Sequence, residues 1–138
     1  MRIFKSISLL LISYLFIQTN LAAETAPIPD NARVARAVFT TGINDREPVN
    51  QVVAIDTRQQ EVFFFTDIRN LQGRTIKHIW VYNGQAVSEN EFPVGGPRWR
   101  VNSRKALDPT MTGKWTVWVV DESGWPLHAS IFMYYPAR

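Results

Sequence analysis

Cysteine is absent from the 138 residues of this chain, and histidine occurs only as His78 and His128. The lack of cysteine excludes disulfide bonds, thiolate zinc sites, iron–sulfur clusters and cysteine nucleophiles. Two histidines are also a poor supply of ligands for an imidazole metal site. We therefore expect neither a metal nor a cofactor, and stability must come from a packed core.

Long hydrophobic runs are lacking except at the N-terminus. Arg2 and Lys5 precede an apolar run over residues 7–17, and small residues lead to a cleavage site near Ala23. This pattern predicts a secretory signal peptide over residues 1–23. Since the run is shorter than the ~20 residues that a bilayer span needs, we expect cleavage, no membrane span afterwards and a periplasmic or secreted protein.

An excess of positive charge is lacking once the predicted signal peptide is set aside. Two of the 15 basic residues lie in it, so 13 basic residues face 12 acidic ones and the net charge falls from +3 to +1. A nearly neutral domain has no broad positive field of the kind that attracts nucleic acid. We therefore expect no nucleic-acid partner.

Hydrophobic residues make up 46% of the chain and aromatic residues 12%, which is enough apolar material for one domain but not for two. Residues 24–32, with Pro27 and Pro29, are predicted to form an extended tether. Residues 33–138 are predicted to form one domain without helical periodicity, in which short Val, Ile, Thr and aromatic runs alternate with Gly, Pro, Asn and Asp. The predicted strands cover residues 33–41, 50–56, 60–69, 74–83, 86–94, 98–105, 114–121 and 127–135.

This pattern predicts an all-β fold, an immunoglobulin-like antiparallel β-sandwich of about seven to eight strands. Turn residues suggest three hairpins. A turn at Gly95-Gly96 would place Phe92 opposite Trp99 and Glu91 opposite Arg100. A turn over residues 71–73 would align Asp67 with Lys77 and put two alternating sets on one face: Val62, Phe64, Thr66 and Ile68 with Ile76, His78, Trp80 and Tyr82. The third hairpin would turn at Gly124.

Several segments carry a family resemblance: INDREPV, FFFTDIRNLQG, IKHIWVYNG, FPVGGPRWRVNSRK and TGKWTVWVVDESG. The chain from Arg33 to Tyr135 resembles the domain of unknown function 2914 family. The most specific segments are His78-x-Trp80, Arg98-Trp99-Arg100 with Ser103, and Gly113-x-Trp115. The resemblance implies a small bacterial β-domain found behind signal peptides or attached to membrane segments, and it carries over no catalytic or binding residue.

A row of arginines is the first candidate surface. Arg98, Arg100 and Arg104 have the same parity in one predicted strand and should point to the same side. Their guanidinium groups could bind an anionic glycan or a phosphate through paired hydrogen bonds. The more common arrangement is a solvated charge ladder, with Glu91 opposite Arg100 and Glu89 diagonal to it.

The predicted last hairpin offers a second surface. If Trp115, Val117 and Val119 face Ala129 and Ile131, the opposite side holds Trp118, His128, Phe132 and Tyr134. Such an aromatic platform could stack on sugar rings or bind a protein. Burial in the core is the more frequent location of Trp and Phe side chains.

Catalytic motifs are not evident. His78 is expected to be a structural histidine that forms a hydrogen bond with Thr66 across the strand, and no nucleophile motif such as G-x-S-x-G surrounds it. Neither the acidic turn around Arg46 nor the one at Asp121 has the spacing of a calcium loop. The glycines at Gly95-Gly96 are not followed by the helix that a phosphate loop requires. We expect no catalytic residue and no enzyme activity.

The sequence thus favours an exported, non-enzymatic module that binds another envelope protein, by sheet-edge addition or through the aromatic face of the last hairpin. The alternative is a glycan-binding module for cell-wall or lipopolysaccharide sugars. In that alternative Trp118 and Tyr134 would stack on sugar rings, and the row of Arg98, Arg100 and Arg104 would bind anionic groups. The sequence does not indicate the oligomeric state.

Overall fold

The computed structural model describes residues 27–138, which form ten β-strands and no helix. The predicted signal peptide lies outside the described residues. The strands are β1 (Arg33–Thr40), β2 (Ile43–Asn44), β3 (Glu47–Pro48), β4 (Ala54–Asp56), β5 (Glu61–Arg69), β6 (Thr75–Tyr82), β7 (Gln85–Pro93), β8 (Arg98–Ala106), β9 (Gly113–Asp121) and β10 (Pro126–Tyr135).

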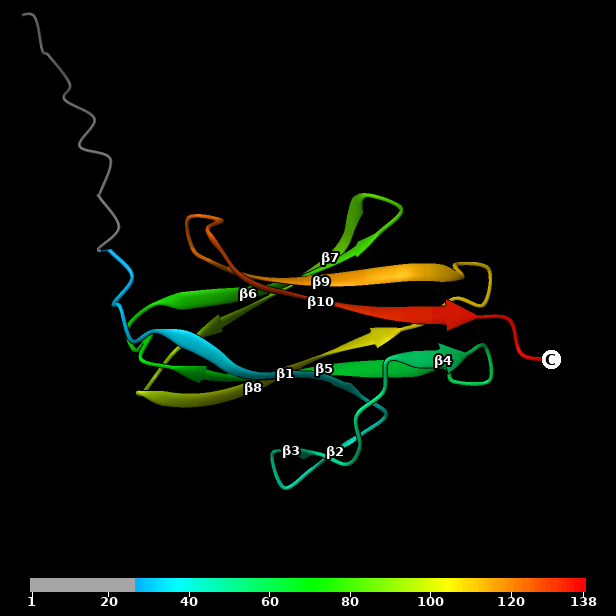
Figure 1. The fold of residues 1–138 in the computed structure, drawn as a ribbon, viewed down its shortest axis with the longest axis horizontal. Coiled ribbons are helices and arrows are strands. Elements are labelled where there is room, and N and C mark those ends of the chain that lie inside the picture. The colour runs from blue at the N-terminus through cyan, green and yellow to red at the C-terminus, as the bar shows by residue number, and fades with distance from the viewer. Residues whose placement is uncertain (1–26) are drawn as a thin grey trace, which may run out of the picture.

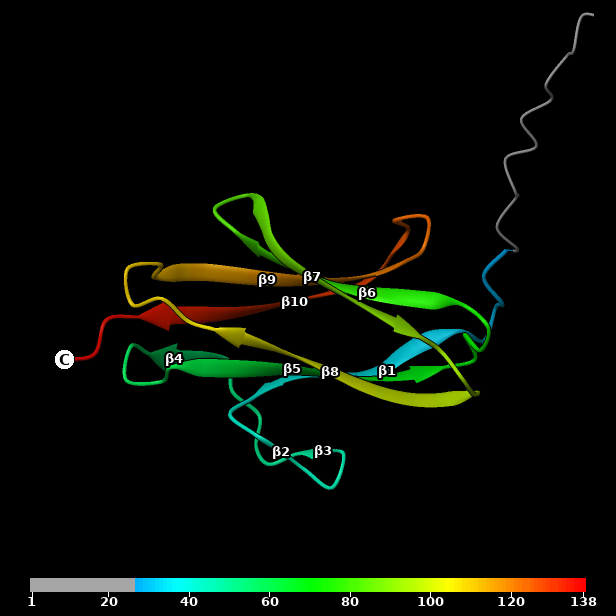
Figure 2. The same cartoon turned by 180° about the vertical axis from the view of Figure 1, so that it is seen from behind.

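Two sheets pack face to face (Figures 1 and 2). One has three strands in the order β1-β5-β8, and the other has five in the order β4-β10-β9-β6-β7. The small β2–β3 hairpin lies outside the three-stranded sheet, as both views show. The predicted all-β sandwich is confirmed, although one pair of strands, β4 and β10, is parallel.

The predicted strands agree with the observed ones to within one residue at each end, except for the run over residues 50–56. Only residues 54–56 of that run form a strand. Val52 bridges to Phe39 of β1, whereas the carbonyl of Val53 accepts a hydrogen bond from Met133 of β10 at 2.9 Å. This segment therefore passes from one sheet to the other along an edge of the sandwich.

The hairpin predicted at Gly95-Gly96 does not form. Strand β7 pairs with β6 in the five-stranded sheet, and β8 pairs with β5 in the three-stranded sheet. Phe92 consequently lies opposite Ile76 rather than Trp99. The glycines belong to a connection that crosses between the sheets.

The hairpin predicted at residues 71–73 is wrong for the same reason, because β5 and β6 lie in different sheets. The connections 70–74 and 94–97 lie beside each other and share backbone hydrogen bonds, from Gly73 to Val94 and from Val94 to Arg74, both 2.8 Å. Leu71 and Val94 are buried in the core. Apolar anchoring of both connections favours a crossing over a solvated tight turn.

The β9–β10 hairpin exists, but its predicted register is off by one residue. Trp118 lies opposite Ala129, and Phe132 lies opposite Trp115. An irregularity between Pro126 and His128 shifts the register, and a one-residue shift moves every side chain of a strand to the other face. Phe132 therefore points into the core instead of joining Trp118 outside.

The core lies between the two inner faces and is rich in aromatic rings. Phe39 of the three-stranded sheet lies 4.7 Å from Phe132 of the five-stranded sheet, measured between ring centroids, and Phe64 lies 6.4 Å from Trp80. Most of these rings meet edge to face, the arrangement that aromatic quadrupoles prefer. The alternation of residues 62–68 and 76–82 onto one interior is as predicted, but the two sets face each other across the sandwich.

The described part of the predicted tether lies against the domain. Residues 29–32 form a turn closed by a hydrogen bond from the Ala32 amide to the Pro29 carbonyl at 2.9 Å. Ile28 and Ala32 pack on the core, and the Asn70 side-chain amide donates to the Asn31 carbonyl at 3.0 Å. The chain thus contacts the sandwich before β1 begins.

Candidate functional site

The predicted site residues separate into three places. The arginine row at Arg98, Arg100 and Arg104 lies on the outer face of the three-stranded sheet, and Trp118 lies on the outer face of the five-stranded sheet. Tyr134 is 1% exposed and belongs to the core. His128 is half-buried at the start of β10, opposite Val119, with its Nε2 2.9 Å from the Ser130 hydroxyl. The predicted aromatic platform is therefore not present.

The basic surface extends over all three strands of its sheet. Register places Arg69 between Arg33 and Arg98, and Asp67 between Arg36 and Arg100. The turn of the β2–β3 hairpin adds a further arginine. We define the arginine face as Arg33, Arg36, Arg46, Arg69, Arg98 and Arg100.

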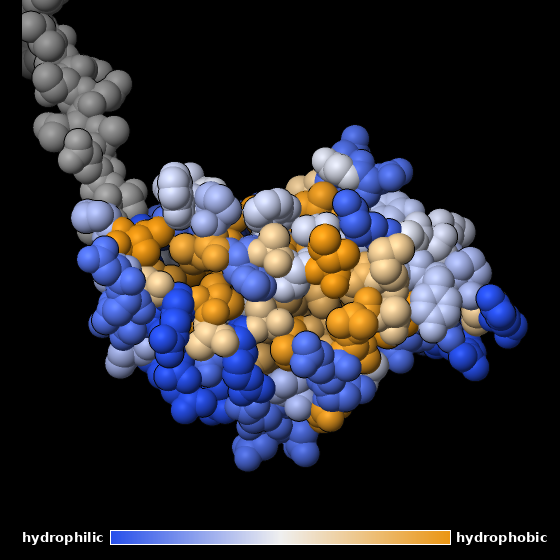
Figure 3. All heavy atoms as spheres, in the orientation of Figure 1, coloured by the Kyte–Doolittle hydropathy of each residue, from blue (hydrophilic) through white to orange (hydrophobic). Residues whose placement is uncertain are grey.

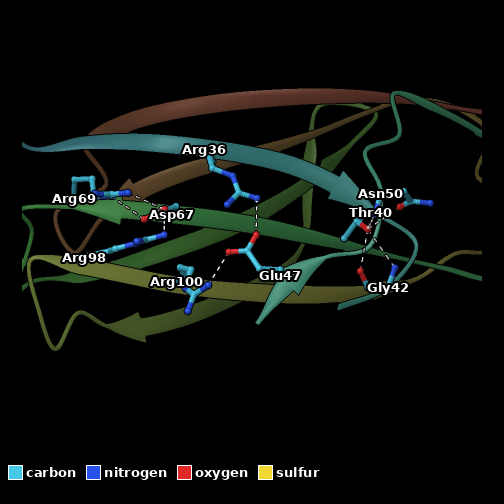
Figure 4. Close-up of polar contacts among 9 residues, drawn as sticks. All are labelled: Arg36, Thr40, Gly42, Glu47, Asn50, Asp67, Arg69, Arg98 and Arg100. Atoms are coloured by element: carbon cyan, nitrogen blue, oxygen red, sulfur yellow. Dashed lines mark hydrogen bonds and ion pairs between the residues drawn. The ribbon is translucent and has the colours of Figure 1, made fainter. Parts of the chain in front are cut away.

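Asp67 is a buried anchor of this face. Its carboxylate accepts hydrogen bonds from Arg69 Nε at 3.0 Å and from Arg69 Nη2 at 3.1 Å, and Arg98 Nη2 lies 3.6 Å away (Figure 4). The Asp67 side chain is 0% exposed, whereas that of Arg98 is 57% exposed. One buried carboxylate thus orients two guanidinium groups that reach the surface.

Glu47 of β3 is the second anchor. It bridges Arg36 at 2.8 Å and Arg100 at 2.6 Å, while the Arg36 guanidinium lies 4.9 Å from the centre of the Phe65 ring (Figure 4). The hydrogen bond from Arg36 is the main cause that lowers the pKa of Glu47, and the hydrogen bond from Arg100 is the second. The same bond to Glu47 raises the pKa of Arg36. These ion pairs hold the β2–β3 hairpin over the sheet.

The predicted charge ladder between β7 and β8 is wrong, because those strands do not pair. Glu89 and Glu91 contact Lys77 at 3.1 and 3.4 Å on the five-stranded sheet. Arg100 is paired with Glu47 instead, and Arg104 is paired with Glu61 at 3.0 Å.

The base of the β2–β3 hairpin is fixed by hydrogen bonds. The Thr40 hydroxyl donates to Asn50 Oδ1 at 2.7 Å and contacts the Gly42 carbonyl at 2.9 Å (Figure 4). At the tip, Asp45 and Arg46 have φ angles of 50° and 62°. A two-residue turn with two positive φ angles prefers Asn-Gly, and an arginine there costs roughly 1 kcal/mol. This strained turn brings Arg46 to the hollow that Arg98 and Arg100 also line, and so into the arginine face.

Two hollows adjoin the arginine face. The first, of about 480 Å³, is lined by Arg33, Arg69 and Arg98, together with Asp30. The second, of about 510 Å³, is lined by Arg46, Arg98 and Arg100. Arg98 lines both hollows, so a ligand that reaches from one to the other would meet it in the middle.

The outer face of the five-stranded sheet has a different character. Trp118, Ile131 and Met133 are 42%, 52% and 46% exposed. Register places Ile79 opposite Trp118 and puts Thr116 between Val81 and Ile131. We call Ile79, Val81, Trp118, Ile131 and Met133 the apolar face. Figure 3 looks onto the edge of the sandwich where β4 and β10 lie, with apolar residues gathered around β10 and hydrophilic residues dominating the lower part of the view, around β2 and β3.

Sequence reasoning found Trp118 but missed Ile131 and Met133. The predicted register put Ile131 in the core, and the bulge at the start of β10 reverses that assignment. The alternation of Ala129, Ile131 and Met133 against Ser130, Phe132 and Tyr134 was the available signal. It contains apolar residues on both sides and does not by itself show which side is buried.

His78 is a structural residue in the core. Its Nε2 lies 3.0 Å from the Thr66 hydroxyl and its Nδ1 lies 2.8 Å from the Ser103 hydroxyl, which also accepts a bond from Trp80 Nε1 at 3.1 Å. The predicted contact with Thr66 is present, but it comes from the facing sheet rather than from a paired strand. Burial lowers the pKa of His78 to about 3, so the ring is neutral near pH 7.

The contact between Ser103 and His78 has the distance of a nucleophile and its base. Ser103 is only 4% exposed and His78 is fully buried. A substrate would have to enter the core to reach them, so we assign the pair to the internal hydrogen-bond network. Within residues 27–138, no group of three or more His, Asp or Glu side chains is arranged to hold a metal ion. No helix in that part of the chain is long and apolar enough to cross a membrane.

Fold and surfaces together define a β-sandwich domain whose three-stranded sheet carries the arginine face and whose five-stranded sheet carries the apolar face next to the ion pairs of Lys77 with Glu89 and Glu91. Residues 73–134 match the family described as protein of unknown function (DUF2914), which supports the resemblance seen in the sequence from β6 onward; the segments quoted before residue 73 lie outside the match. The match covers β6 to β9 and almost all of β10, and therefore includes Arg98, Arg100, Arg104 and Trp118. Comparison with curated proteins gives no match.

Proposed function

We propose that this protein is an exported, non-enzymatic β-sandwich that binds another protein of the cell envelope through its apolar face. The observation that supports this proposal is the joint exposure of Trp118, Ile131 and Met133 on neighbouring strands. An antiparallel sheet usually presents polar side chains on its solvated side. A contiguous apolar area on a soluble domain marks an interaction surface more often than isolated exposed residues do.

Trp118 is the expected centre of the contact. It lies on β9, with β10 on one side and β6 on the other, so apolar neighbours from both strands surround it. Buried tryptophans are enriched among the residues that dominate interface energies, especially near the middle of a contact. The predicted signal peptide is what supports export, and it makes an envelope protein the expected partner.

The glycan-binding alternative required Trp118, Tyr134 and the arginine row on one surface. Tyr134 is in the core, and the arginines lie on the other sheet. A second exposed ring, Tyr135 at 47% exposure, has the same parity in β10 as Ile131, but it lies at the end of the strand beside β4 and not beside Trp118. The geometry therefore favours a protein partner for this face.

The test is cross-linked capture from intact cells with the tagged protein and two tryptophan variants. Trp118→Ala removes the centre of the apolar face. Trp125→Ala is the matched control, because Trp125 is 63% exposed but lies in the turn between β9 and β10. We expect one discrete protein to be captured by the wild type and by Trp125→Ala and to be lost with Trp118→Ala.

Equal capture by both variants would contradict the proposal. Sedimentation of the purified protein provides the second check. A dimer that dissociates on Trp118→Ala would show that the apolar face is covered by a second copy of this chain, and the proposed separate partner would be wrong.

A further inference from the structure

We propose that the arginine face is a binding site for a ligand with two neighbouring anionic groups, phosphate or carboxylate, held on the two sides of Arg98. This site is independent of the proposed protein contact because it lies on the opposite sheet. Four features support it: the local charge, the unused hydrogen-bond donors, the fixed positions of the guanidinium groups and the two hollows.

The charge of the arginine face exceeds that of the domain. Its six arginines are accompanied by Asp67 and Glu47 within it and by Asp30 and Asp45 at its margins, which leaves a net charge of +2. Residues 24–138 as a whole carry only +1. Positive charge is thus concentrated on this sheet, where it would attract anions at moderate ionic strength.

Several guanidinium groups keep donors available for a ligand. A guanidinium has five N–H donors, but within residues 27–138 the Arg98 side chain forms one ion pair, with Asp67 at 3.6 Å, which is longer than a hydrogen bond. Arg33 and Arg46 form no ion pair with any residue of the described range 27–138, and both are exposed. These three arginines could each offer paired N–H groups to a phosphate or carboxylate.

The remaining guanidinium groups are fixed before a ligand arrives. Asp67 holds Arg69 through two hydrogen bonds, and Glu47 holds Arg36 and Arg100 at 2.8 and 2.6 Å. Each carboxylate contacts two arginines, so a net positive charge remains around each carboxylate. Side chains already held in position lose little conformational entropy on binding.

The two hollows determine the form of the ligand. Arg33 and Arg69 line one hollow, Arg46 and Arg100 line the other, and Arg98 is common to both. A single anion can occupy only one of them. A ligand with two adjacent anionic groups can place one group in each hollow, and both groups can then contact Arg98. Inorganic pyrophosphate and an oligouronate both carry such adjacent groups.

The test is titration of the purified protein with pyrophosphate, trigalacturonate and single inorganic phosphate, followed by calorimetry and backbone amide NMR. Arg98→Gln is the test variant. Arg104→Gln is the control, because Arg104 lies on the same side of β8 with 63% side-chain exposure, is paired with Glu61 and lines neither hollow. Melting curves of both variants establish that they are folded.

We expect pyrophosphate or trigalacturonate to bind more tightly than single phosphate and to shift amides around residues 31–33 and 97–102. Arg98→Gln should weaken binding at least about tenfold, and Arg104→Gln less than about twofold, since a charge-assisted hydrogen bond contributes more than long-range attraction. The more tightly bound probe identifies the source as a phosphorylated compound or an acidic glycan. Equal losses in the two variants, or no binding of either probe at millimolar concentration, would overturn the proposal.

Discussion

The two outer faces of the sandwich differ in how far the chain itself pairs or covers their side chains. On the three-stranded sheet, Asp67 and Glu47 supply counterions from the same chain, and the Arg36 guanidinium lies over Phe65, which is 1% exposed. On the five-stranded sheet, Trp118 and Ile131 are exposed, and no other part of residues 27–138 covers them. The side chains of the charged face are therefore held by ion pairs within the chain, whereas those of the apolar face are left open to solvent, as the proposed protein contact requires.

Neighbouring residues of β10 give the largest expected contrast. Phe132 is fully buried and contacts Phe39 and Trp115, whereas Ile131 is 52% exposed on the apolar face. Phe132→Ala should lower the free energy of unfolding by about 3–5 kcal/mol because it leaves a cavity in the core. Ile131→Ala should change it by about 0.5 kcal/mol or less. Urea denaturation measures both, and equal losses would show that the observed register of β10 is wrong.

Acid should weaken the core that supports both faces. Burial disfavours the charged form of His78 and lowers its pKa from 6.5, the ordinary value expected in the unfolded chain, to about 3 in the folded protein. The unfolded chain therefore binds a proton below pH 6.5 that the folded chain does not bind. The contribution of the neutral ring is fully present above pH 6.5 and is lost as the pH falls toward 3.

The free energy of unfolding should fall by about 2 kcal/mol between pH 7 and pH 5, where most carboxylates are still ionised. Urea denaturation at pH 7 and pH 5 measures this loss. His78→Gln should be less stable at pH 7 but nearly insensitive to pH over the same interval. A wild-type protein with equal stability at both pH values would contradict a buried, neutral His78.

The smallest expected effect concerns the strained turn beside the charged face. Arg46→Gly places glycine at a φ angle of 62° and should raise the free energy of unfolding by about 0.5–1 kcal/mol. The same change should weaken pyrophosphate binding, because it removes a cation from one hollow. Arg46→Lys keeps the charge and the strain and should leave stability unchanged. A less stable Arg46→Gly variant would show that the side chain of Arg46 contributes more than its backbone strain costs.

Local sequence patterns predicted the sandwich and seven of the ten strands, but they missed β2 and β3 and placed the start of β4 four residues too early. Alternating Val, Ile, Thr and aromatic residues set the strand limits, and the parity of Arg98, Arg100 and Arg104 correctly put them on one side. Strand pairing was harder to predict. A glycine turn shows that the chain reverses, but it does not show whether the next strand joins the same sheet, so Gly95-Gly96 was misread as a hairpin.

Which residues form each face is decided by long-range contacts and by a strand irregularity, and local sequence patterns contain neither. Glu47 reaches Arg100 across 53 positions of sequence, and it does so only because the β2–β3 hairpin folds back over the sheet. The exposure of Ile131 depends on one irregularity after Pro126. Long-range contacts and single bulges therefore decided which residues form each surface.

The most direct test of the central claim, that the apolar face binds a protein, is cross-linked capture from intact cells at low and high salt with three proteins: the wild type, Trp118→Ala and Arg98→Gln. Apolar contacts depend little on ionic strength, whereas exposed charge contacts weaken as salt increases. We predict that the wild type and Arg98→Gln capture the same discrete protein at both salt concentrations and that Trp118→Ala does not. Capture that survives Trp118→Ala, or that is lost with Arg98→Gln and at high salt, would contradict the claim.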